Sequence, residues 1–540
     1  MTRVERPSGE LGSLLLVLHA HLPWVRHPEH PDFLEEDWFF EAVAECYLPL
    51  LDVFDRLETE GIDFRLTLTL SPTLLAMLQD PLLLERCARR FERLVALGTR
   101  ECGRTRGTPE LEALAAFHRA FYVARLEQFE ALGRDLLAPF RHHAEAGRLE
   151  LLTCAATHAF LPLLRDHPEA LRAQLQVGCE AHRRALGRSP QGIWLPECGF
   201  FPGLDALLAE QGLRYFFLES RGVLWARPTP PAGVALPILT PSGLAAFGRD
   251  PESAAEVWSA EVGYPGHPDY REFHRDLGFE RPFEEVAPWM LPTGVRRATG
   301  YRYWRVTGAT ADKALYDPVQ AIARAKAHAR DFVTRRVARL GSMQDAPAGF
   351  QVLTAPYDAE LFGHWWFEGP VFLEAVLREL ARADAPIRAV TAPGYLAGHP
   401  ARILATPAES SWGHGASAET WLDPANDWIQ RELPQATEAF VAAVAARAEP
   451  DPRARFVLAE AGRELLLAQA SDWPFMLRAG TTASYATARI RGHLARMWEL
   501  LRALDATGEA PVEAGPAPIF PWLDPSVWRP RKASPSSPEC

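Results

Sequence analysis

The sequence predicts an α/β fold with parallel strands, and two features of the chain support this expectation. Short apolar runs recur along the chain, and patterns typical of helices separate them. Continuous apolar runs of this length are typical of strands that are buried on both faces. In addition, each run ends in polar or special residues, and His, Glu and Asp collect at these ends. Because the sites of such folds lie beyond the carboxyl ends of the strands, we expect the functional site there.

The expected strands cover residues 14–18, 64–70, 149–152, 192–195, 215–218, 244–247, 350–353 and 387–390. Residues 74–146 instead contain long helical stretches without a convincing strand, which predicts a helical insertion. Helical patterns also cover residues 428–446, 454–469 and 482–504. We therefore expect an α/β domain at 12–400 that includes the insertion, a C-terminal helical domain at 401–515, and disordered tails at 1–10 and 525–540.

The composition argues against several kinds of partner. The 540 residues carry a formal net charge of −12 without a basic stripe, which argues against nucleic acid. No apolar stretch approaches the roughly 18 residues of a membrane helix, and no cleavage site for a secretory leader follows the run at 14–18. The seven scattered cysteines contain no CxxC pair, so neither a disulfide framework nor a zinc knuckle is expected. These observations predict a soluble, cytoplasmic protein.

Carboxylates at the ends of two expected strands are candidates for catalysis. Glu197 stands between Pro196 and Cys198, directly after the expected buried strand at 192–195. Asp358 and Glu360 lie in a segment that is rich in aromatic residues and His. Two acids at different strand ends can converge over the mouth of a barrel. One acid that protonates a leaving oxygen and a second that attacks or activates water are the groups that glycosyl transfer needs. A structural salt bridge or helix cap is the alternative for each acid alone.

Two histidines at the first strand end allow two interpretations. His19 and His21 are two residues apart, so their rings point to the same face of the strand. They could bind a metal with His158 as a third ligand, or they could hydrogen-bond sugar hydroxyls. No Asp or Glu at ligand spacing is obvious beside them, which favours sugar contacts. The 16 tryptophans, several in Gly-rich polar segments, also favour a sugar ligand, although most tryptophans in a chain belong to the core.

Five segments in order carry a resemblance to a known family. They are His19-Ala20-His21-Leu22-Pro23, Thr153 to His158, Trp194-Leu195-Pro196-Glu197-Cys198-Gly199, Tyr357 to Trp366, and Ser411-Trp412-Gly413 through Glu419-Thr420-Trp421. With these segments, residues 12–515 resemble glycoside hydrolase family 57, and within it the 1,4-α-glucan branching enzymes.

The resemblance implies a distorted (β/α)7 barrel and a retaining mechanism on an α-1,4-glucan such as amylose, amylopectin or glycogen, with no metal or organic cofactor. Glu197 matches the nucleophile and Asp358 the general acid/base, and their carboxyl groups should then lie about 5–5.5 Å apart. The matching substrate-binding residues are His19, His21, His158, Trp412, Trp421 and Asp472.

One stretch departs from the family pattern. Branching members carry a loop with a Tyr that screens the intermediate from water, between the third and fourth segments. The comparable stretch is 243–266, where Phe247 stands in the expected place of that Tyr and Tyr264 follows later. The acceptor therefore stays open: an α-amylase or a 4-α-glucanotransferase would use the same acids. A metal-dependent sugar deacetylase and an inactive glucan-binding scaffold are the alternatives from other classes.

Overall fold

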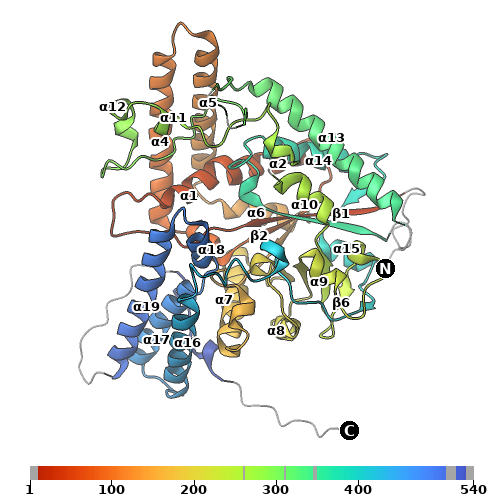
Figure 1. Ribbon diagram of the computed structural model, residues 1–540, viewed down its shortest axis with the longest axis vertical. Helices are drawn as coiled ribbons and strands as arrows, with labels where there is room; N and C mark the ends of the chain where they lie inside the picture. Colours follow the sequence, from red (N-terminus) through yellow and green to blue (C-terminus); the bar gives the residue numbers. More distant parts are fainter. Residues whose placement is uncertain are drawn as a thin grey trace.

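A computed structural model describes residues 10–259, 262–308, 310, 312–343, 350–505 and 519–530 of the chain (Figure 1). Of the two expected tails, residues 1–9 and 531–540 lie outside the described residues. Residues 525–530 do not: Pro525–Trp528 forms a short 3₁₀ helix, η9, and Trp528 is fully buried. The expectation of a tail from residue 525 is therefore wrong for this segment, because Trp528 packs against Phe440 of the C-terminal helices.

In the described part of the chain, two sheets together form a ring of seven parallel strands. One sheet contains, in order, β3 (Leu149–Leu152), β2 (Leu66–Leu70), β1 (Gly12–Ala20) and β8 (Val352–Asp358). The other contains, in order, β7 (Ala245–Gly248), β5 (Tyr215–Leu218) and β4 (Gly192–Ile193). This second sheet continues on the free edge of β7 with β6 (Ile238–Leu239) and then β10 (Ile403–Leu404), which are not part of the ring. Single parallel bridges close the ring, between Thr153 and Ile193 and between Arg249 and Thr354. The expected distorted (β/α)7 barrel is thus confirmed.

The distortion lies at β1. Along one edge, β1 pairs with β8 from Ser13 to His19. Along the other edge, β9 (Ile387–Ala389) pairs with the start of β1, and β2 pairs only with its end, from Val17 to Ala20. The ring is therefore irregular at the amino ends of its strands and closed at their carboxyl ends. There His19 lies between Asp358 and Thr69 in register.

All eight expected strands are present, and β8 is the one that differs most from its prediction. It continues to Asp358, whereas the apolar run predicted an end at residue 353. Thr354 and Pro356 interrupt the hydrophobic pattern, but the strand still pairs with β1 along its length. All nine residues of β1 are buried, as expected for a strand covered on both faces.

The region between β2 and β3 is helical, as expected. It contains α3 (Pro72–Met77), α4 (Pro81–Arg104), α5 (Pro109–Ala131) and α6 (Leu137–Glu145). Asp80 caps α4 by accepting a hydrogen bond from the amide of Leu83, and Pro81 occupies the first helical position. Helices α4 and α5 form a hairpin that projects beyond the barrel (Figure 1).

The helices expected near the C-terminus are α16 (Ile429–Ala445), α17 (Pro452–Ala468) and α19 (Ala483–Asp505). A further short helix, α18 (Asp472–Ala479), links α17 to α19 and was not expected. The three long helices lie side by side at one end of the molecule (Figure 1). The exact division of the chain into domains stays a prediction.

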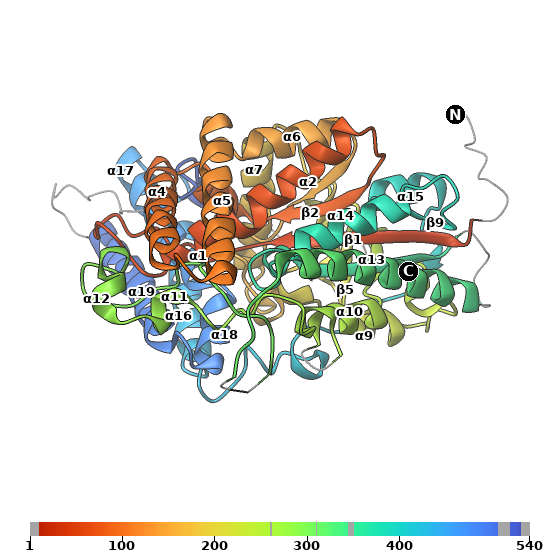
Figure 2. The same cartoon turned by 90° about the horizontal axis from the view of Figure 1, so that it is seen from above.

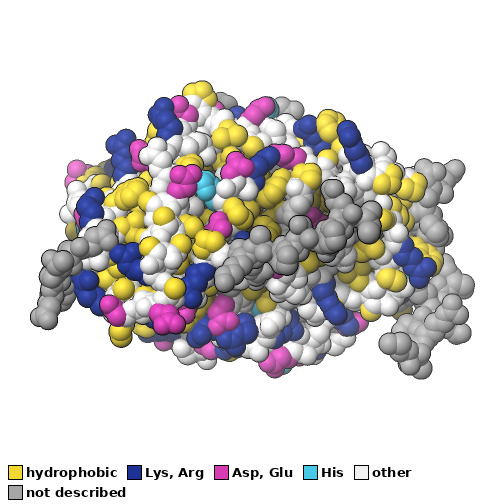
Figure 3. Space-filling model, turned by 90° about the horizontal axis from the view of Figure 1, so that it is seen from below, with side chains coloured by type: hydrophobic (Ala, Val, Ile, Leu, Met, Phe, Trp, Pro, Cys, Tyr) yellow, Lys and Arg dark blue, Asp and Glu magenta, His cyan; other side chains and the backbone are white. Residues whose placement is uncertain are grey.

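One face of the molecule can be compared with the charge distribution expected from the sequence. On the face drawn in Figure 3, basic and acidic side chains are interspersed, without a large patch of either sign. Among the described residues, no helix has the length and apolar character that a membrane span requires.

Candidate active site

A cleft opens at the carboxyl ends of the barrel strands, with α18 at one wall. Its volume is about 870 Å³, which is within the usual range for a small-ligand site. All eight residues expected at the site line it, although they are spread from residue 19 to residue 472 of the chain: His19, His21, His158, Glu197, Asp358, Trp412, Trp421 and Asp472.

Glu197 follows β4 within a single 3₁₀ turn, Pro196–Cys198. Its backbone has a φ of 61°, a left-handed conformation that is unfavourable for a residue with a side chain. Its two carboxylate oxygens each accept one hydrogen bond. Oε2 accepts from Trp412 Nε1 at 2.7 Å, and Oε1 accepts from Ser471 Oγ at 2.8 Å. Both bonds favour the ionised form, and they fix the carboxylate in one orientation.

Asp358 is the last residue of β8, and its environment differs from that of Glu197. Burial raises the pKa of Asp358 well above its ordinary value, and the nearby charges of Glu360 and Glu197 raise this pKa further. Burial also raises the pKa of Glu197, but the hydrogen bonds from Trp412 and Ser471 oppose this increase, whereas no hydrogen bond from the described residues opposes that of Asp358. The two environments therefore favour a protonated Asp358 beside an ionised Glu197. This is the division that an acid and a nucleophile need.

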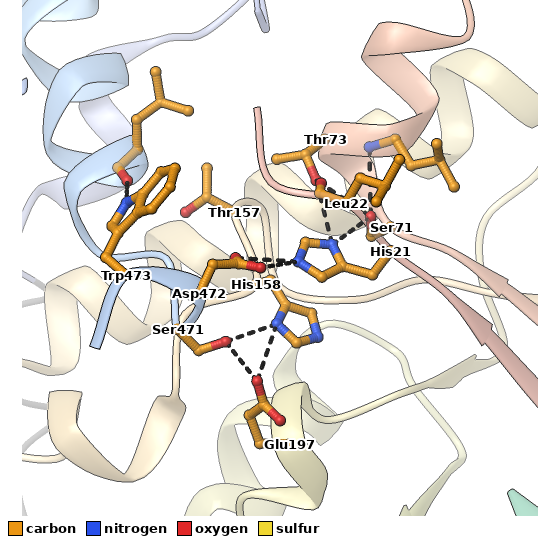
Figure 4. A network of polar contacts seen from close by, with 12 residues as sticks. His21, Leu22, Ser71, Thr73, Thr157, His158, Glu197, Ser471, Asp472 and Trp473 are labelled. Atoms are coloured by element: carbon orange, nitrogen blue, oxygen red, sulfur yellow. Dashed lines mark hydrogen bonds and ion pairs between the residues drawn. The ribbon is translucent and has the colours of Figure 1, made fainter. Parts of the chain in front are cut away.

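Three histidine rings lie together beside Glu197, and Figure 4 shows two of them, His21 and His158. The ring of His158 lies 3.8 Å from that of His21 and 5.0 Å from that of His19, with angles of 12° and 20° between the ring planes. The ring of His19 also packs on that of the buried Trp194, at 5.0 Å. His158, like Glu197, has a positive φ, of 58°.

A chain of hydrogen bonds leads from His19 through His158 and Ser471 to Glu197, and each group donates to the next. Ser471 donates to Glu197, so its oxygen can accept from His158 Nδ1, which lies 2.8 Å away. His158 Nε2 is then an acceptor for His19 Nε2, at 2.9 Å. This arrangement requires the ring of His158 to be neutral, because one of its nitrogens donates while the other accepts. Burial lowers the pKa of His19 and of His158 well below the ordinary value, in agreement with neutral rings.

His21, His158 and Asp472 are the side chains of the described cleft that could together hold a metal ion, since their ligand atoms lie within 4.8 Å of one another. However, each of their ring nitrogens already has a partner. His21 Nδ1 contacts Ser71 Oγ at 2.8 Å, and its Nε2 lies 3.2 Å from both oxygens of Asp472. The donor set therefore fits a hydrogen-bonding surface for sugar hydroxyls better than a metal centre.

Glu360 is a third carboxyl group in the cleft. Its Oε1 accepts hydrogen bonds from Tyr47 Oη at 2.5 Å and from the backbone amide of His21 at 3.2 Å. Burial raises the pKa of Glu360 to about 7, although these two hydrogen bonds oppose the shift. The group therefore changes its charge close to neutral pH, beside Asp358.

The family model described as glycosyl hydrolase family 57 matches residues 15–402. The chain belongs to glycosyl hydrolase family 57. A second model, described as the C-terminal part of 1,4-alpha-glucan branching enzyme, matches residues 432–528.

Three relatives are similar to this chain over most of its length. The 1,4-alpha-glucan branching enzyme TK1436 of Thermococcus kodakarensis is 32% identical over 89% of this chain and 72% of that protein. In its crystal structure, TK1436 has a TM-score of 0.82 over 92% of each chain. A probable 1,4-alpha-glucan branching enzyme of Mycobacterium tuberculosis is 32% identical over 89% of this chain and 90% of that one. The alpha-amylase AmyC from Thermotoga maritima has 39% identity and a TM-score of 0.88, over 96% of this chain and 99% of that chain.

Neither Phe247 nor Tyr264, the two residues considered in the stretch that departs from the family 57 branching pattern, lines the cleft. Phe247 lies in β7, is buried, and packs on Phe217 and Tyr395. Tyr264 is buried as well, and its hydroxyl donates to Asp331 at 2.7 Å. The expectation that Phe247 takes the place of a screening Tyr is therefore wrong, since its ring belongs to the barrel core.

Aromatic side chains cover much of the cleft wall in this family 57 protein. Trp412 lies over Glu197, whereas Trp421 is only 1% exposed and stacks on Phe160 at 4.2 Å. Three aromatic residues that the sequence analysis did not select are more open: Trp258, Trp365 and Phe475 are 41%, 53% and 52% exposed. They are better placed than Trp421 to offer a free ring face to a sugar.

Sequence analysis also missed two polar residues near the acids. Ser471 precedes α18 and reaches Glu197, and Arg249 follows β7 with its guanidinium 5.7 Å from the ring of Trp412. Arg249 could have been found, because it stands at a strand end like the acids do. Ser471 directly precedes Asp472, which the family resemblance selected, but no pattern in the sequence gives Ser471 itself a role.

Proposed function

We propose that this protein is a retaining 1,4-α-glucan branching enzyme, which cleaves an α-1,4 link and transfers the chain to a 6-hydroxyl to form an α-1,6 branch. The hydrogen bond from Ser471 to Glu197 carries the proposal. Ser471 lies in the region that matches the branching-enzyme C-terminal model, so this region takes part directly in the active site. The relatives from Thermococcus kodakarensis and Mycobacterium tuberculosis, both described as branching enzymes, support it.

In this mechanism the glucan lies across the cleft, and Asp358 protonates the glycosidic oxygen while Glu197 attacks the anomeric carbon. The raised pKa of Asp358 keeps a proton available for the leaving group, and the hydrogen bonds from Trp412 and Ser471 aim the carboxylate of Glu197. The result is a covalent glycosyl-enzyme. Asp358 has then lost its proton and activates the acceptor hydroxyl in the second step, so that the anomeric configuration is retained.

The remaining predicted residues take binding roles in this proposal. His19, His21, His158 and Asp472 contact sugar hydroxyls, and Trp412 packs against a sugar ring. Trp421, predicted for the same role, has little free ring face because it is 1% exposed. No metal or organic cofactor is required, because the two carboxyl groups supply both the proton and the nucleophile. We also propose a cytoplasmic location. The free thiols of the six described cysteines fit a reducing compartment.

A glucan hydrolase is the second candidate, and the 39% identity with the alpha-amylase AmyC favours it. The two activities share both acids and differ only in the acceptor. Neither Phe247 nor Tyr264 reaches the cleft to exclude water, and from the same stretch Trp258 lines it instead. The acceptor therefore has to be measured.

Incubation with amylose distinguishes the two candidates. A branching enzyme should produce new α-1,6 signals in the proton NMR spectrum, with few new reducing ends and a weaker iodine complex. A hydrolase should produce reducing ends without α-1,6 signals, and that result would reject the branching proposal. New α-1,4-linked products of altered length without branches would indicate a 4-α-glucanotransferase.

Replacement of Glu360 by Gln should move the alkaline limb of the pH profile to lower pH. Above pH 7, ionised Glu360 raises the pKa of Asp358, and the amide removes this charge. Asp358 then loses its proton at lower pH, so the acid form that starts catalysis disappears earlier. The Gln side chain can still accept the hydrogen bond from Tyr47, so the plateau rate should fall by less than about tenfold.

The measurement is kcat/KM for amylose between pH 5 and 9. Glu150→Gln is a matched control, because Glu150 is a buried carboxyl that accepts a 2.6 Å hydrogen bond from Tyr215, outside the residues lining the cleft. Its pH profile should match the wild type. An unchanged alkaline limb in Glu360→Gln would show that the charge of Glu360 does not affect the pKa of Asp358.

A further inference from the structure

A second cluster of metal-binding side chains lies away from the active-site cleft, between α2 (Leu48–Thr59) and α6. Glu58 of α2 and the adjacent His142 and His143 of α6 each offer one ligand atom, and these atoms lie within 4.8 Å of one another. The two helices lie side by side on one flank of the barrel (Figure 2). Each ends shortly before a strand begins, so the cluster lies at the amino ends of β2 and β3, opposite the active-site cleft.

The inner ligand, His143, has a nitrogen without a hydrogen-bond partner. Its side chain is fully buried, and Nε2 lies 2.8 Å from Asp55 Oδ1. If Nε2 donates to this carboxylate, Nδ1 carries a lone pair. Nδ1 is buried, makes no hydrogen bond in the described structure, and lies 3.7 Å from Glu58 Oε2. A lone pair thus faces a carboxylate oxygen, an arrangement that a cation between them would stabilise.

The other two ligand atoms complete a site for an ion. Arg148 Nη1 holds Glu58 Oε1 at 2.6 Å and leaves Oε2 for the site. His142 Nε2 lies 2.8 Å from that same Oε2, and the side chain of His142 is 58% exposed, so solvent reaches the cluster. A tetrahedral Zn²⁺ with bonds of about 2.0–2.1 Å needs its ligand atoms about 3.3 Å apart. The observed separations of 2.8 and 3.7 Å lie on either side of this value.

We propose that Glu58, His142 and His143 bind a divalent transition-metal ion of the Zn²⁺ type, with water as the fourth ligand. Two imidazoles and a carboxylate are ligands that Zn²⁺ accepts readily. Asp55 supports the site as the carboxylate that orients a metal-bound histidine through its other nitrogen. All three ligands lie in the last turns of their helices, where the helix dipoles also favour a cation. The ion links α2 to α6 and has a structural role, since it lies far from the cleft.

Zinc titration of the full-length, EDTA-treated protein tests the proposal, with calorimetry and elemental analysis as readouts. The wild type should bind one Zn²⁺ per chain at low micromolar free zinc, and a hundredfold excess over Kd should raise the Tm by about 2 °C. His142→Ala and Glu58→Gln should abolish this binding, and Asp55→Asn should weaken it by about 10- to 100-fold. His142 is exposed, so its replacement should leave the fold intact.

Two controls separate this cluster from other sources of zinc affinity. His30→Ala removes an exposed histidine outside the cluster, and Asp472→Asn removes a ligand from the group in the cleft; both should bind zinc at this site like the wild type. The proposal fails if His142→Ala retains the full stoichiometry and affinity, or if Asp472→Asn alone removes the bound ion. It also fails if the wild type binds no stoichiometric zinc.

Discussion

Replacement of Glu197 by Gln should abolish cleavage of amylose, with a loss of more than about 10⁴-fold in kcat. The amide has almost the same shape as the carboxylate and can still accept the hydrogen bond from Trp412, but it cannot attack the anomeric carbon. The loss should therefore appear in both branching and hydrolysis, because both require the same glycosyl-enzyme. Reducing-end and NMR assays on the purified variant measure it.

The fold of this variant should be unaffected. Gln replaces a buried group whose pKa is raised by burial, so no favourable charge is lost, and the Tm should stay within about 2 °C of the wild type. A variant that remains as active as the wild type would remove Glu197 as nucleophile. Loss of activity together with unfolding would instead point to the buried hydrogen bond from Ser471, which an amide nitrogen at this position cannot accept.

The shorter variant Glu197→Ala gives a stereochemical test of the same role. It leaves space beside the anomeric carbon for a small anion such as azide, while Asp358 remains able to protonate the leaving group. Azide should then restore cleavage and yield a β-glycosyl azide, the product of a single inversion. An α-glycosyl azide from this variant would contradict a nucleophilic role for Glu197, because a second inversion requires another nucleophile.

The barrel could be predicted because its strands are buried on both faces. Such strands are continuous apolar runs, and all eight expected runs became strands. The end of β8 could not be predicted in this way, because Thr354 and Pro356 break the apolar pattern while the backbone of β1 still pairs with them. Helix α18 was missed for a related reason: it is short, and Pro474 stands in its first turn.

The acids and histidines of the cleft could be predicted because polar side chains directly after buried strands are conspicuous. Their partners could not, because these come from segments that only the tertiary structure brings close. Ser471 contacts Glu197 from 274 positions further along the chain. Phe247 shows the opposite error: its sequence position suggested the cleft, but β7 directs its ring into the core beside Phe217. The cluster of Glu58, His142 and His143 likewise depends on how α2 packs against α6.

Replacement of Asp358 by Asn should have an effect that depends on the leaving group. With amylose, loss of the acid should lower kcat by about 10²–10⁴-fold. An α-maltooligosyl fluoride needs no proton on its leaving fluoride, so Glu197 should still be glycosylated rapidly. The second step lacks its base, however, and the covalent intermediate should accumulate. We expect a burst of fluoride equal to the enzyme concentration and a matching mass increase on the peptide that contains Glu197.

Azide completes this argument because it attacks without transferring a proton. Added to Asp358→Asn with the fluoride substrate, it should restore turnover and give an α-glycosyl azide, since two inversions occur on Glu197. The opposite products of the two variants, β from Glu197→Ala and α from Asp358→Asn, would separate the roles of the two carboxyl groups. Absence of the fluoride burst, with glycosylation slowed as much on the fluoride as cleavage is on amylose, would contradict an acid role for Asp358, because only protonation of the leaving group distinguishes the first step on these substrates.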